Sequence, residues 1–414
     1  MENKNLTEAN MTQRALINYE EFHIEEFVEE FKKAKAKIDS LRRCSRCLLP
    51  ETFPFITFDE EGVCNFCHNY KKIELLGVDR LQEELDFHKN ADGTVKCVVS
   101  FSGGRDSSYG LHIVKKVLGL DAVAFTYDWG VASDVAQRNQ SRLCNKLGVE
   151  HFLIKADLDK KRKNIKANLS AWLKQPDLGT IPVLTSVGQQ FFYHANQVGK
   201  KLGRDLIILC ATPLEHTFFK AGFSGIKPSF TKSSNQAFDK VKLALNYFKK
   251  YIQNPAYINR SVLDTIGGYL SFYIIPHNYL RLFNYLEWKE SEVNNTLINE
   301  YGWETSDETP STWRIDDGTV PLSDYMYYIM SGLTINDTFR SNQIREGRIT
   351  RDEGFEKIQQ ENLPRFHAIQ WYCDKIGVDF ESTIRTINNA RRLYCSAFFI
   401  LLPPFFLFPC SKFN

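Results

Sequence analysis

The sequence predicts an α/β protein built on a parallel sheet, with a cysteine-bearing segment before the sheet and a mainly helical region after it. Short apolar runs alternate with segments of helical periodicity between residues 91 and 234, as expected for parallel strands covered by helices on both faces. Two Cys-x-x-Cys pairs precede this stretch. From residue 235 onward the pattern is mainly helical and rich in Tyr and Phe.

The composition is that of a globular protein of more than one domain. The chain has 414 residues, which is enough for two or three domains of roughly 100–200 residues each. Hydrophobic residues make up 43% and charged residues 25%, and these values exclude wholesale disorder. Lys and Arg number 52 against 50 Asp and Glu, so the chain lacks the basic bias of a protein that coats nucleic acid.

The pattern along the chain divides it into five segments. We expect a helical N-terminal arm (1–43), a metal-binding ribbon with its linker (44–90), a sheet domain (91–234), a helical region for substrate or partner (235–392) and an apolar C-terminal tail (393–414). Strands are predicted at 95–99, 122–127, 152–154 and 205–210, and helices at 109–119, 134–148 and 189–202.

The two ends of the chain bear on its location. The N-terminal residues are polar and acidic without an apolar core, so no signal peptide is expected. The apolar run 393–409 is shorter than the about 20 residues that span a bilayer, and Pro403-Pro404 would break its helix. We therefore expect a cytoplasmic protein, whose apolar end is either buried or an aberrant end of the reading frame.

The four paired cysteines predict a structural zinc site. Two Cys-x-x-Cys turns separated by 16 residues present four thiolates tetrahedrally, whereas an iron–sulfur cluster usually has different spacing. Four sulfur ligands leave no open position for water, so the zinc would be structural. His68 is expected to be a neighbour of the metal. The predicted ligands are Cys44, Cys47, Cys64 and Cys67.

Residues 102–108, with the sequence SGGRDSS, predict a phosphate-binding loop. They follow an apolar strand and open a helix, where glycines allow close approach of an anion and free N–H groups point at its oxygens. The alternative is a Gly-Gly turn before a helix cap. The loop resembles the SGGxDS loop of the PP-loop ATP pyrophosphatases, which cut ATP between the α and β phosphates and form an adenylate. The resemblance implies ATP and Mg²⁺, bound by Ser102, Gly103, Gly104, Asp106, Ser107 and Ser108, with Asp106 at the metal.

Two further residues are expected near the nucleotide. Arg105 fills the variable position of the loop, where it either assists the departure of pyrophosphate or lies in solvent. Asp128 ends a predicted strand, at the edge of the sheet where such folds bind ligands and where the superfamily holds adenine and ribose. Trp129 beside it serves the nucleotide or anchors the core.

The ribbon sequence CSRCLLPETFP…GVCNFC, followed by SGGRDSSYG, resembles the N-acetyl sugar amidotransferases of surface-polysaccharide (lipopolysaccharide) biosynthesis. The resemblance covers roughly residues 40–390 and continues in Pro213-Leu214-Glu215, Thr312-Trp313-Arg314 and Asn336-Asp337-Thr338-Phe339-Arg340. It implies an enzyme that adenylates the acetamido group of a sugar or nucleotide sugar with ATP and replaces AMP by ammonia, giving an acetamidino group. Arg314 and Arg340 then contact a phosphate, or they form surface salt bridges.

No glutaminase is visible in the chain, because no cysteine stands in a nucleophile setting with a histidine partner. The resemblance implies separate ammonia-supplying subunits similar to the glutaminase and cyclase of imidazole-glycerol-phosphate synthase. Neither nucleic acid nor a membrane is expected as a partner.

The chain departs from the family pattern after the fourth strand. Cys210-Ala211-Thr212 stand where the family tends to carry Gly-Glu-Asn, so Glu215 is the nearest carboxylate. The predicted catalytic residues are Asp106, Arg105 and Glu215, and His216 and Lys220 flank the last of these.

Two other functions remain open at this stage. One is tRNA thiolation, which also joins a zinc ribbon to a PP-loop and which Cys210, at a strand end, would serve as the catalytic cysteine. The other is an interaction module with a vestigial ATP site, which the departure at 210–212 favours.

Overall fold

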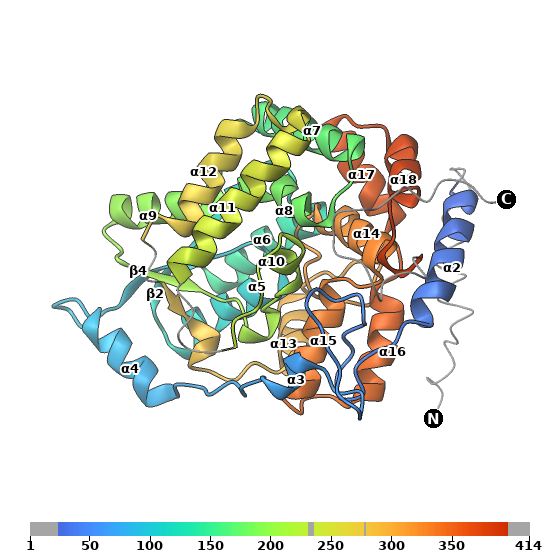
Figure 1. Cartoon of the computed structure of the whole chain (residues 1–414). Coiled ribbons are helices and arrows are strands. Elements are labelled where there is room, and N and C mark those ends of the chain that lie inside the picture. Colours follow the sequence, from blue (N-terminus) through green and yellow to red (C-terminus); the bar gives the residue numbers. More distant parts are fainter. Residues whose placement is uncertain (1–23, 231–235, 277–278, 396–414) are drawn as a thin grey trace.

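The computed structural model describes residues 24–230, 236–276 and 279–395 (Figure 1). Within them, five strands form one parallel sheet in the order β3-β2-β1-β4-β5. The strands are β1 (Lys96–Ser100), β2 (Asp121–Asp128), β3 (Glu150–Lys155), β4 (Leu206–Leu209) and β5 (Leu280–Arg281). The predicted parallel α/β class is therefore confirmed. Residues 1–23 of the predicted arm and 396–414 of the apolar tail lie outside the described residues.

The strand order reverses at the centre of the sheet. From β1 the chain adds β2 and then β3 on one side, and it returns to place β4 on the other side of β1. The segments that leave the carboxyl ends of β1 and β4 therefore run in opposite directions and open a crevice, which is the usual ligand site of such folds. This crevice receives both the loop 102–108 and the segment that contains Glu215.

The fifth strand, β5, is a short exception in the region after residue 235, which the sequence predicts to be mainly helical. It pairs with β4 through Ile208 and Leu280 and through Leu209 and Arg281. A strand of two residues is too short to show a period in the sequence, so its pairing depends on the neighbouring strand.

Helices cover both faces of the sheet. Val98 of β1 packs with Ala195 and Val198 of α9 on one face, whereas Cys97 and Val99 share the larger core with α5 and α6 on the other. The helices of this half are α4 (Val78–Phe87), α5 (Arg105–His112), α6 (Asp134–Leu147), α7 (Leu158–Lys174), α8 (Ile181–Leu184), α9 (Phe191–Leu202) and α10 (Phe219–Phe223).

The first of the predicted helices begins earlier than expected. The helix predicted at 109–119 is α5 from Arg105, followed by a π-helical turn Ile113–Val117. Gly104 is its extended N-cap residue. Asp106 and Ser107 therefore belong to the first helical turn, where backbone N–H groups have no partner within the helix.

The C-terminal half is helical, as predicted, and the N-terminal helix lies against it at one edge of the molecule (Figure 1). The helices of the C-terminal half are α11 (Gln236–Gln253), α12 (Val262–Tyr273), α13 (Glu290–Asn295), α14 (Val320–Ser331), α15 (Ile335–Arg345), α16 (Arg351–Glu361), α17 (Phe366–Ile376) and α18 (Phe380–Asn388). Helix α2 (Glu25–Asp39) buries Phe27 against Phe366 of α17 and Phe31 against Tyr328 of α14. None of the helices in the part of the chain that the structure describes is both long enough and apolar enough to span a bilayer.

The ribbon lies against α15 and α16. It contains the short helix α3 (Asn65–His68). Arg351, at the start of α16, donates to the carbonyl oxygens of Cys44 and Cys47 at 3.2 Å each. A Cβ on Gly354 of α16 would approach the side chain of Ile344 to 2.7 Å, so the packing here leaves little free space.

Candidate functional site

The phosphate loop (residues 102–108) joins β1 to α5 in the crevice. Two side chains from other segments hydrogen bond to its backbone carbonyl oxygens. Gln140 of α6 donates to the carbonyl oxygen of Ser102 at 2.8 Å, and the indole N–H of Trp303 donates to that of Gly103 at 3.1 Å. The first-turn N–H groups of α5 have no partner within the helix, and a helix start of this kind attracts anions. Gln140 and Trp303 were not predicted, because they are far away in the sequence.

Both glycines of the loop are required by their surroundings. Gly103 has φ +81°, a left-handed conformation, and a Cβ there would lie 2.4 Å from the carbonyl oxygen of Ala136. Gly104 is extended, but a Cβ on it would lie 2.6 Å from the carboxylate of Asp316. The loop therefore has a bare backbone where an anion would approach.

The serines of the loop are bonded mainly to one another. The hydroxyls of Ser102 and Ser107 lie 3.0 Å apart, and the N–H of Gly104 donates to the Ser102 oxygen at 3.3 Å. The hydroxyl of Ser107 donates to the Gly104 carbonyl at 3.2 Å. The hydroxyl of Ser108 is buried and has no hydrogen-bond partner among the described residues. The predicted serines thus lie together at the start of α5.

Arg105 does not lie in solvent, so that alternative is wrong. Its side chain is fully buried. Its Nε donates to Asp106 at 2.8 Å, and its Nη1 donates to Glu290 at 3.0 Å and to Thr312 at 3.2 Å. Its guanidinium also lies over the ring of Trp288 at 4.6 Å. The variable residue of the loop therefore holds the carboxylate next to it, because burial is tolerated only when the charge is paired.

Asp106 and Glu215 form a carboxyl pair at the crevice. Glu215 ends the 3₁₀ turn Pro213–Glu215 that follows β4, and its carboxyl group hydrogen bonds that of Asp106. Burial raises the pKa of Glu215 well above its ordinary value, and Asp106 adds to this effect. Although burial opposes it, Arg105 holds the pKa of Asp106 below its ordinary value, aided by hydrogen bonds from Glu215 and Trp288. Glu215 therefore keeps its proton, and its carboxyl O–H donates a hydrogen bond to the ionised carboxylate of Asp106.

Asp316 is a site residue that sequence reasoning missed. Its carboxylate lies against Gly104 and accepts a hydrogen bond from the Ser102 hydroxyl, and burial raises its pKa. The backbone around it is tied to the loop after β2, since Ser133 N–H donates to the Asp316 carbonyl at 3.0 Å and Gly318 N–H donates to that of Val131 at 3.0 Å. No local pattern marks Asp316, because it comes from a loop some 210 residues beyond the phosphate loop.

Asp128 lies at the carboxyl end of β2, as predicted. Its Oδ1 accepts the Gly130 N–H at 2.9 Å, and its carbonyl accepts the Ala156 N–H at 2.9 Å. Trp129 packs against Gly188, where a Cβ would lie 3.1 Å from its indole ring. Both residues are at the same edge of the sheet as the phosphate loop, without a hydrogen bond between them and that loop in the described structure.

The two predicted arginines have different surroundings. Arg314, with φ +52°, is partly exposed and donates to Glu215 at 3.5 Å. Arg340 is buried on α15 and pairs with Glu290, at 2.5 Å, and with Glu361. Arg314 therefore lies at the crevice, whereas Arg340 forms buried ion pairs, so the alternative of a surface salt bridge is wrong for Arg340.

Arg340 is also part of the wall of a cavity of about 720 Å³ between α13, α15 and α16. Glu290 lines the same cavity and binds both Arg340 and Arg105. One partly buried carboxylate, that of Glu290, thus connects the cavity with the side chain of Arg105 in the phosphate loop.

The four predicted cysteines lie together and are buried. Their sulfur atoms are within 4.8 Å of one another, with Sγ–Sγ distances of 3.9 Å for Cys44 and Cys67 and 3.8 Å for Cys47 and Cys64. Sulfurs about 2.3 Å from one tetrahedral zinc would lie about 3.8 Å apart, so the donor set fits a single metal ion. In a four-iron cluster each cysteine binds a different iron atom, and this geometry does not suit it.

The surroundings of the cysteines also suit a thiolate site. Arg345 of α15 donates to Cys47 at 3.2 Å and to Cys67 at 3.3 Å, which offsets part of the negative charge. His68 is exposed, and its Nε2 lies 2.5 Å from Asp59. It is a neighbour of the site and not a ligand, as expected.

Cys210 is buried against α5. A Cβ on Gly110 would lie 2.2 Å from its sulfur, so the thiol occupies the space that this glycine leaves. Burial raises the pKa of Cys210. A protonated, enclosed thiol is a poor nucleophile, which speaks against the thiolation alternative.

The parallel sheet with its reversed strand order and the SGGRDSS loop at the reversal support assignment to the PP-loop ATP pyrophosphatase superfamily. No family model matches the chain. Among curated proteins, the chain is similar to a glutamine-dependent NAD(+) synthetase of Mycobacterium leprae, with 25% identity over 151 residues, which are 32% of this chain and 21% of that protein. It is also similar to an uncharacterised protein of Methanocaldococcus jannaschii, with 32% identity over 87 residues, which are 21% of this chain and 33% of that protein.

The chain thus spans between a fifth and a third of the length of the curated relatives it matches. Solved structures with some likeness include an NH3-dependent NAD synthetase of Campylobacter jejuni, at 16% identity and TM-score 0.24, covering 48% of this chain and 94% of that one. A U34-tRNA thiolase of Methanococcus maripaludis has 13% identity and TM-score 0.28, covering 77% of this chain and 90% of that one.

Proposed function

We propose that the chain is an ATP-dependent amidotransferase that converts the acetamido group of an N-acetyl sugar, free or nucleotide-linked, into an acetamidino group. The observation that carries the proposal is the Asp106–Glu215 carboxyl pair beside a glycine-rich anion loop at the strand reversal. The similarity to an NAD(+) synthetase supports ATP use, and the sequence resemblance described above supports the sugar amide.

The phosphate loop binds ATP and supports departure of pyrophosphate. Free N–H groups at the start of α5 and the hydroxyls of Ser102 and Ser107 supply donors to the phosphates, and such preorganised donors stabilise the charge that develops on the leaving group. The sugar amide oxygen attacks the α-phosphorus, the bond to the β-phosphate breaks, and the amide proton is lost.

The carboxylates that fit Mg²⁺ are those of Asp106 and Asp316. Magnesium prefers one or two carboxylates together with phosphate oxygens. When bound, it would neutralise phosphate charge and orient the chain of phosphates. Without a cation, the Asp316 carboxylate would repel the phosphate that the loop attracts.

Glu215 and Arg314 belong to the second half of the reaction. Ammonia attacks the activated carbon, a C–N bond forms, the C–O bond to AMP breaks, and the proton lost by ammonia protonates the new amidine. Arg314 is partly exposed beside Glu215 and offers a charge to the departing AMP phosphate. Ammonia would come from a separate glutaminase subunit or from solution, and the four cysteines would hold one structural Zn²⁺.

The experiment is incorporation of labelled pyrophosphate into ATP, with UDP-N-acetylglucosamine and UDP-N-acetylgalactosamine as probes. We expect sugar-stimulated exchange that Asp106→Asn abolishes and that Asp307→Asn, a change at an exposed aspartate, leaves intact. Exchange stimulated by tRNA in place of sugar would favour thiolation. ATP binding without any exchange would favour an interaction module, and either result overturns the proposal.

A further inference from the structure

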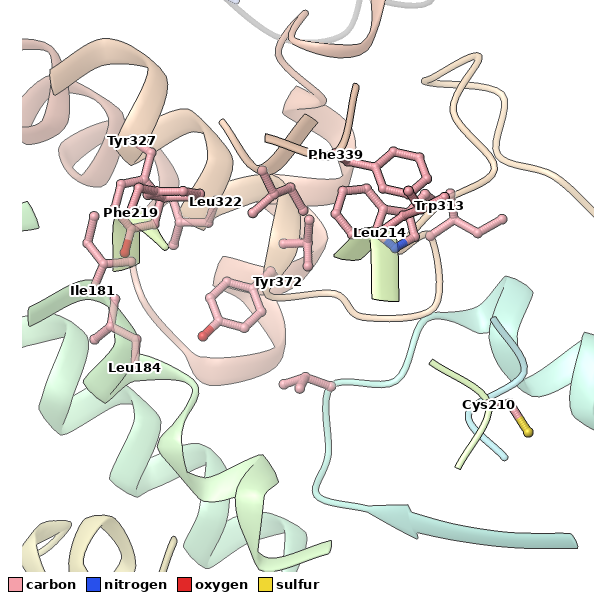
Figure 2. Packing of buried hydrophobic residues seen from close by; sticks show 14 of the residues in the cluster. Ile181, Leu184, Cys210, Leu214, Phe219, Trp313, Leu322, Tyr327, Phe339 and Tyr372 are labelled. Atoms are coloured by element: carbon pink, nitrogen blue, oxygen red, sulfur yellow. The ribbon is translucent and has the colours of Figure 1, made fainter. Parts of the chain in front are cut away.

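Lys220, on α10, is an amine that the reaction as described leaves unused. It is partly buried, and its Nζ makes no hydrogen bond or ion pair with any described residue. The residue before it, Phe219, packs edge-on against Tyr327 of α14 at 4.9 Å, and Figure 2 shows the two rings beside Leu322. Helix α10 is therefore packed against α14 at the residue next to Lys220.

Four charged groups act on Lys220, and they come from three other segments of the chain. They are Arg314 and Asp317 from the loop that contains Asp316, Asp324 from α14, and Glu215 from the turn after β4. Because Arg314 also donates a hydrogen bond to Glu215 at 3.5 Å, Lys220 neighbours this pair of side chains at the nucleotide crevice. Burial, together with Arg314, lowers the pKa of Lys220 to about 8, so at neutral pH part of it is a free amine.

Asp324, one of these charged groups, acts electrostatically on both Lys220 and Tyr327, and its Oδ2 lies 3.6 Å from Nη2 of Arg365. The Oδ1 of Asp324 and the hydroxyl of Tyr327 are buried and have no hydrogen-bond partner among the described residues. The pKa of Asp324 is raised to about 6 by burial, so its carboxylate is mostly ionised at neutral pH. A buried acceptor without a donor costs free energy and is typical of a place that a small ligand occupies.

We propose that Lys220, Asp324 and Tyr327 form the ammonium site of the reaction, in which Lys220 is the base that converts ammonium into ammonia. Ammonium donates hydrogen bonds to Asp324 Oδ1 and to the Tyr327 oxygen. It then passes one proton to the lysine amine, and the lone pair of the resulting ammonia attacks the activated carbon. Lys220 returns its proton to solvent before the next turnover. This inference rests on the proposed amidotransferase reaction and adds the identity of the residues that prepare its nucleophile.

Two variants of Lys220 distinguish a role of its amine in proton transfer from a role of its positive charge. Lys220→Arg keeps the charge but remains protonated, because arginine does not titrate in proteins. Lys220→Met keeps the length without an amine. We expect both to lose at least tenfold in ammonium-dependent amidine formation while sugar-stimulated pyrophosphate exchange stays within threefold of wild type. Lys201→Met, at an exposed lysine of α9, is the matched control and leaves both rates unchanged.

The decisive experiment replaces ammonium by hydroxylamine as the nucleophile. Hydroxylamine is mostly unprotonated at neutral pH, so no base is needed to free its lone pair. We expect Lys220→Met to form the hydroxyamidine at a rate within threefold of wild type. Equal loss with ammonium and hydroxylamine, or full activity of Lys220→Arg, would show a structural role and overturn the inference. Asp324→Asn should raise the KM for ammonium at least fivefold with little change in exchange, and an unchanged KM contradicts the site.

A readout without substrate complements these rates. Trace acylation of the lysines followed by mass spectrometry should label Lys220 half-maximally near pH 8. If the wild-type chain shows no sugar-stimulated exchange, the proposed function fails and the ammonium site fails with it. If exchange is present but ammonium use is unaffected by the Lys220 variants, only this inference fails.

Discussion

The carboxylate of Asp316 lies against Gly104, so close that a single methyl group on the glycine would come within 2.6 Å of it. The two residues are far apart in the sequence, and the contact brings a negative charge to a loop built to attract one. A carboxylate and a phosphate share this place only if a cation lies between them or if the aspartate moves or is neutral.

Removal of the Asp316 carboxylate should therefore change ATP binding in opposite directions with and without magnesium. We expect Asp316→Ala to weaken binding of ATP with Mg²⁺ at least fivefold and to strengthen binding of ATP in EDTA. Titration calorimetry measures both affinities. Asp307→Ala, at an exposed aspartate, is the control, and equal changes under the two conditions would contradict a cation at this position.

Gly103→Ala should destabilise the protein more than a glycine-to-alanine change does at a left-handed glycine with open space around it. The change adds the strain of a left-handed alanine, about 1–2 kcal/mol, to a contact of 2.4 Å with the Ala136 carbonyl oxygen. Gly119→Ala is the matched control, since Gly119 has φ +67° with open space around it. Urea denaturation should show a larger loss of unfolding free energy for Gly103→Ala, and equal losses would mean that the loop relaxes away from α6.

Arg105→Met should be strongly destabilising although it places an apolar side chain in a buried position. It leaves the buried carboxylate of Asp106 without its cation, whereas Glu290 keeps its ion pair with Arg340, and an uncompensated buried charge costs about 3–5 kcal/mol. Arg138→Met removes an exposed ion pair with Glu304 and should cost less than about 1 kcal/mol. Chemical denaturation of both variants checks the difference, and a stable Arg105→Met protein would contradict it.

Glu215 should give the protein a pH dependence that Glu215→Gln lacks. Because the pKa of Glu215 is raised in the folded state, the folded protein binds this proton more tightly than the unfolded chain does. Its contribution to stability is therefore present at low pH and is lost as pH rises from 4.5, the ordinary value, toward the raised pKa. Glutamine keeps a donor to Asp106 without titrating.

Thermal unfolding from pH 4.5 to 8 tests this expectation. The unfolding free energy of wild type should fall relative to that of Glu215→Gln as pH rises. Glu150→Gln, at an exposed glutamate, is the control and should follow wild type. Parallel curves for wild type and Glu215→Gln would show that Glu215 is ionised throughout.

The cysteine site should hold one metal ion and depend on Arg345. We expect one zinc per chain by elemental analysis and no visible absorbance of an iron–sulfur cluster. Arg345→Leu should release the metal to a chelator faster than wild type, because Arg345 donates to two of the sulfurs. Iron in near fourfold excess over chains would contradict a single-ion site.

Cys210→Ala should retain sugar-stimulated exchange within about twofold. The thiol fills space beside Gly110 and is shielded from the crevice, so its loss costs packing, about 1 kcal/mol, and no chemistry. Loss of all activity with an unchanged melting temperature would restore the case for a catalytic cysteine.

Local patterns in the sequence were sufficient for much of the fold and for part of the site. Strand and helix alternation gave four of the strands within one or two residues, because parallel strands are apolar and covering helices have a clear period. The four cysteines and the phosphate loop were recognisable because their chemistry depends on spacing within a short segment. The two-residue β5 has no such period and was missed.

By itself, the amino-acid order determined the α/β class, the donor set for a metal and the presence of an anion loop, since each is encoded by neighbours along the chain. Only the tertiary structure decided that Glu215 carries a proton for Asp106, that Arg105 is buried between two carboxylates, and that Asp316 lies on Gly104. These relationships join segments separated by roughly 100 to 200 residues. Their charges depend on burial and on partners brought by other elements, which no local spacing records.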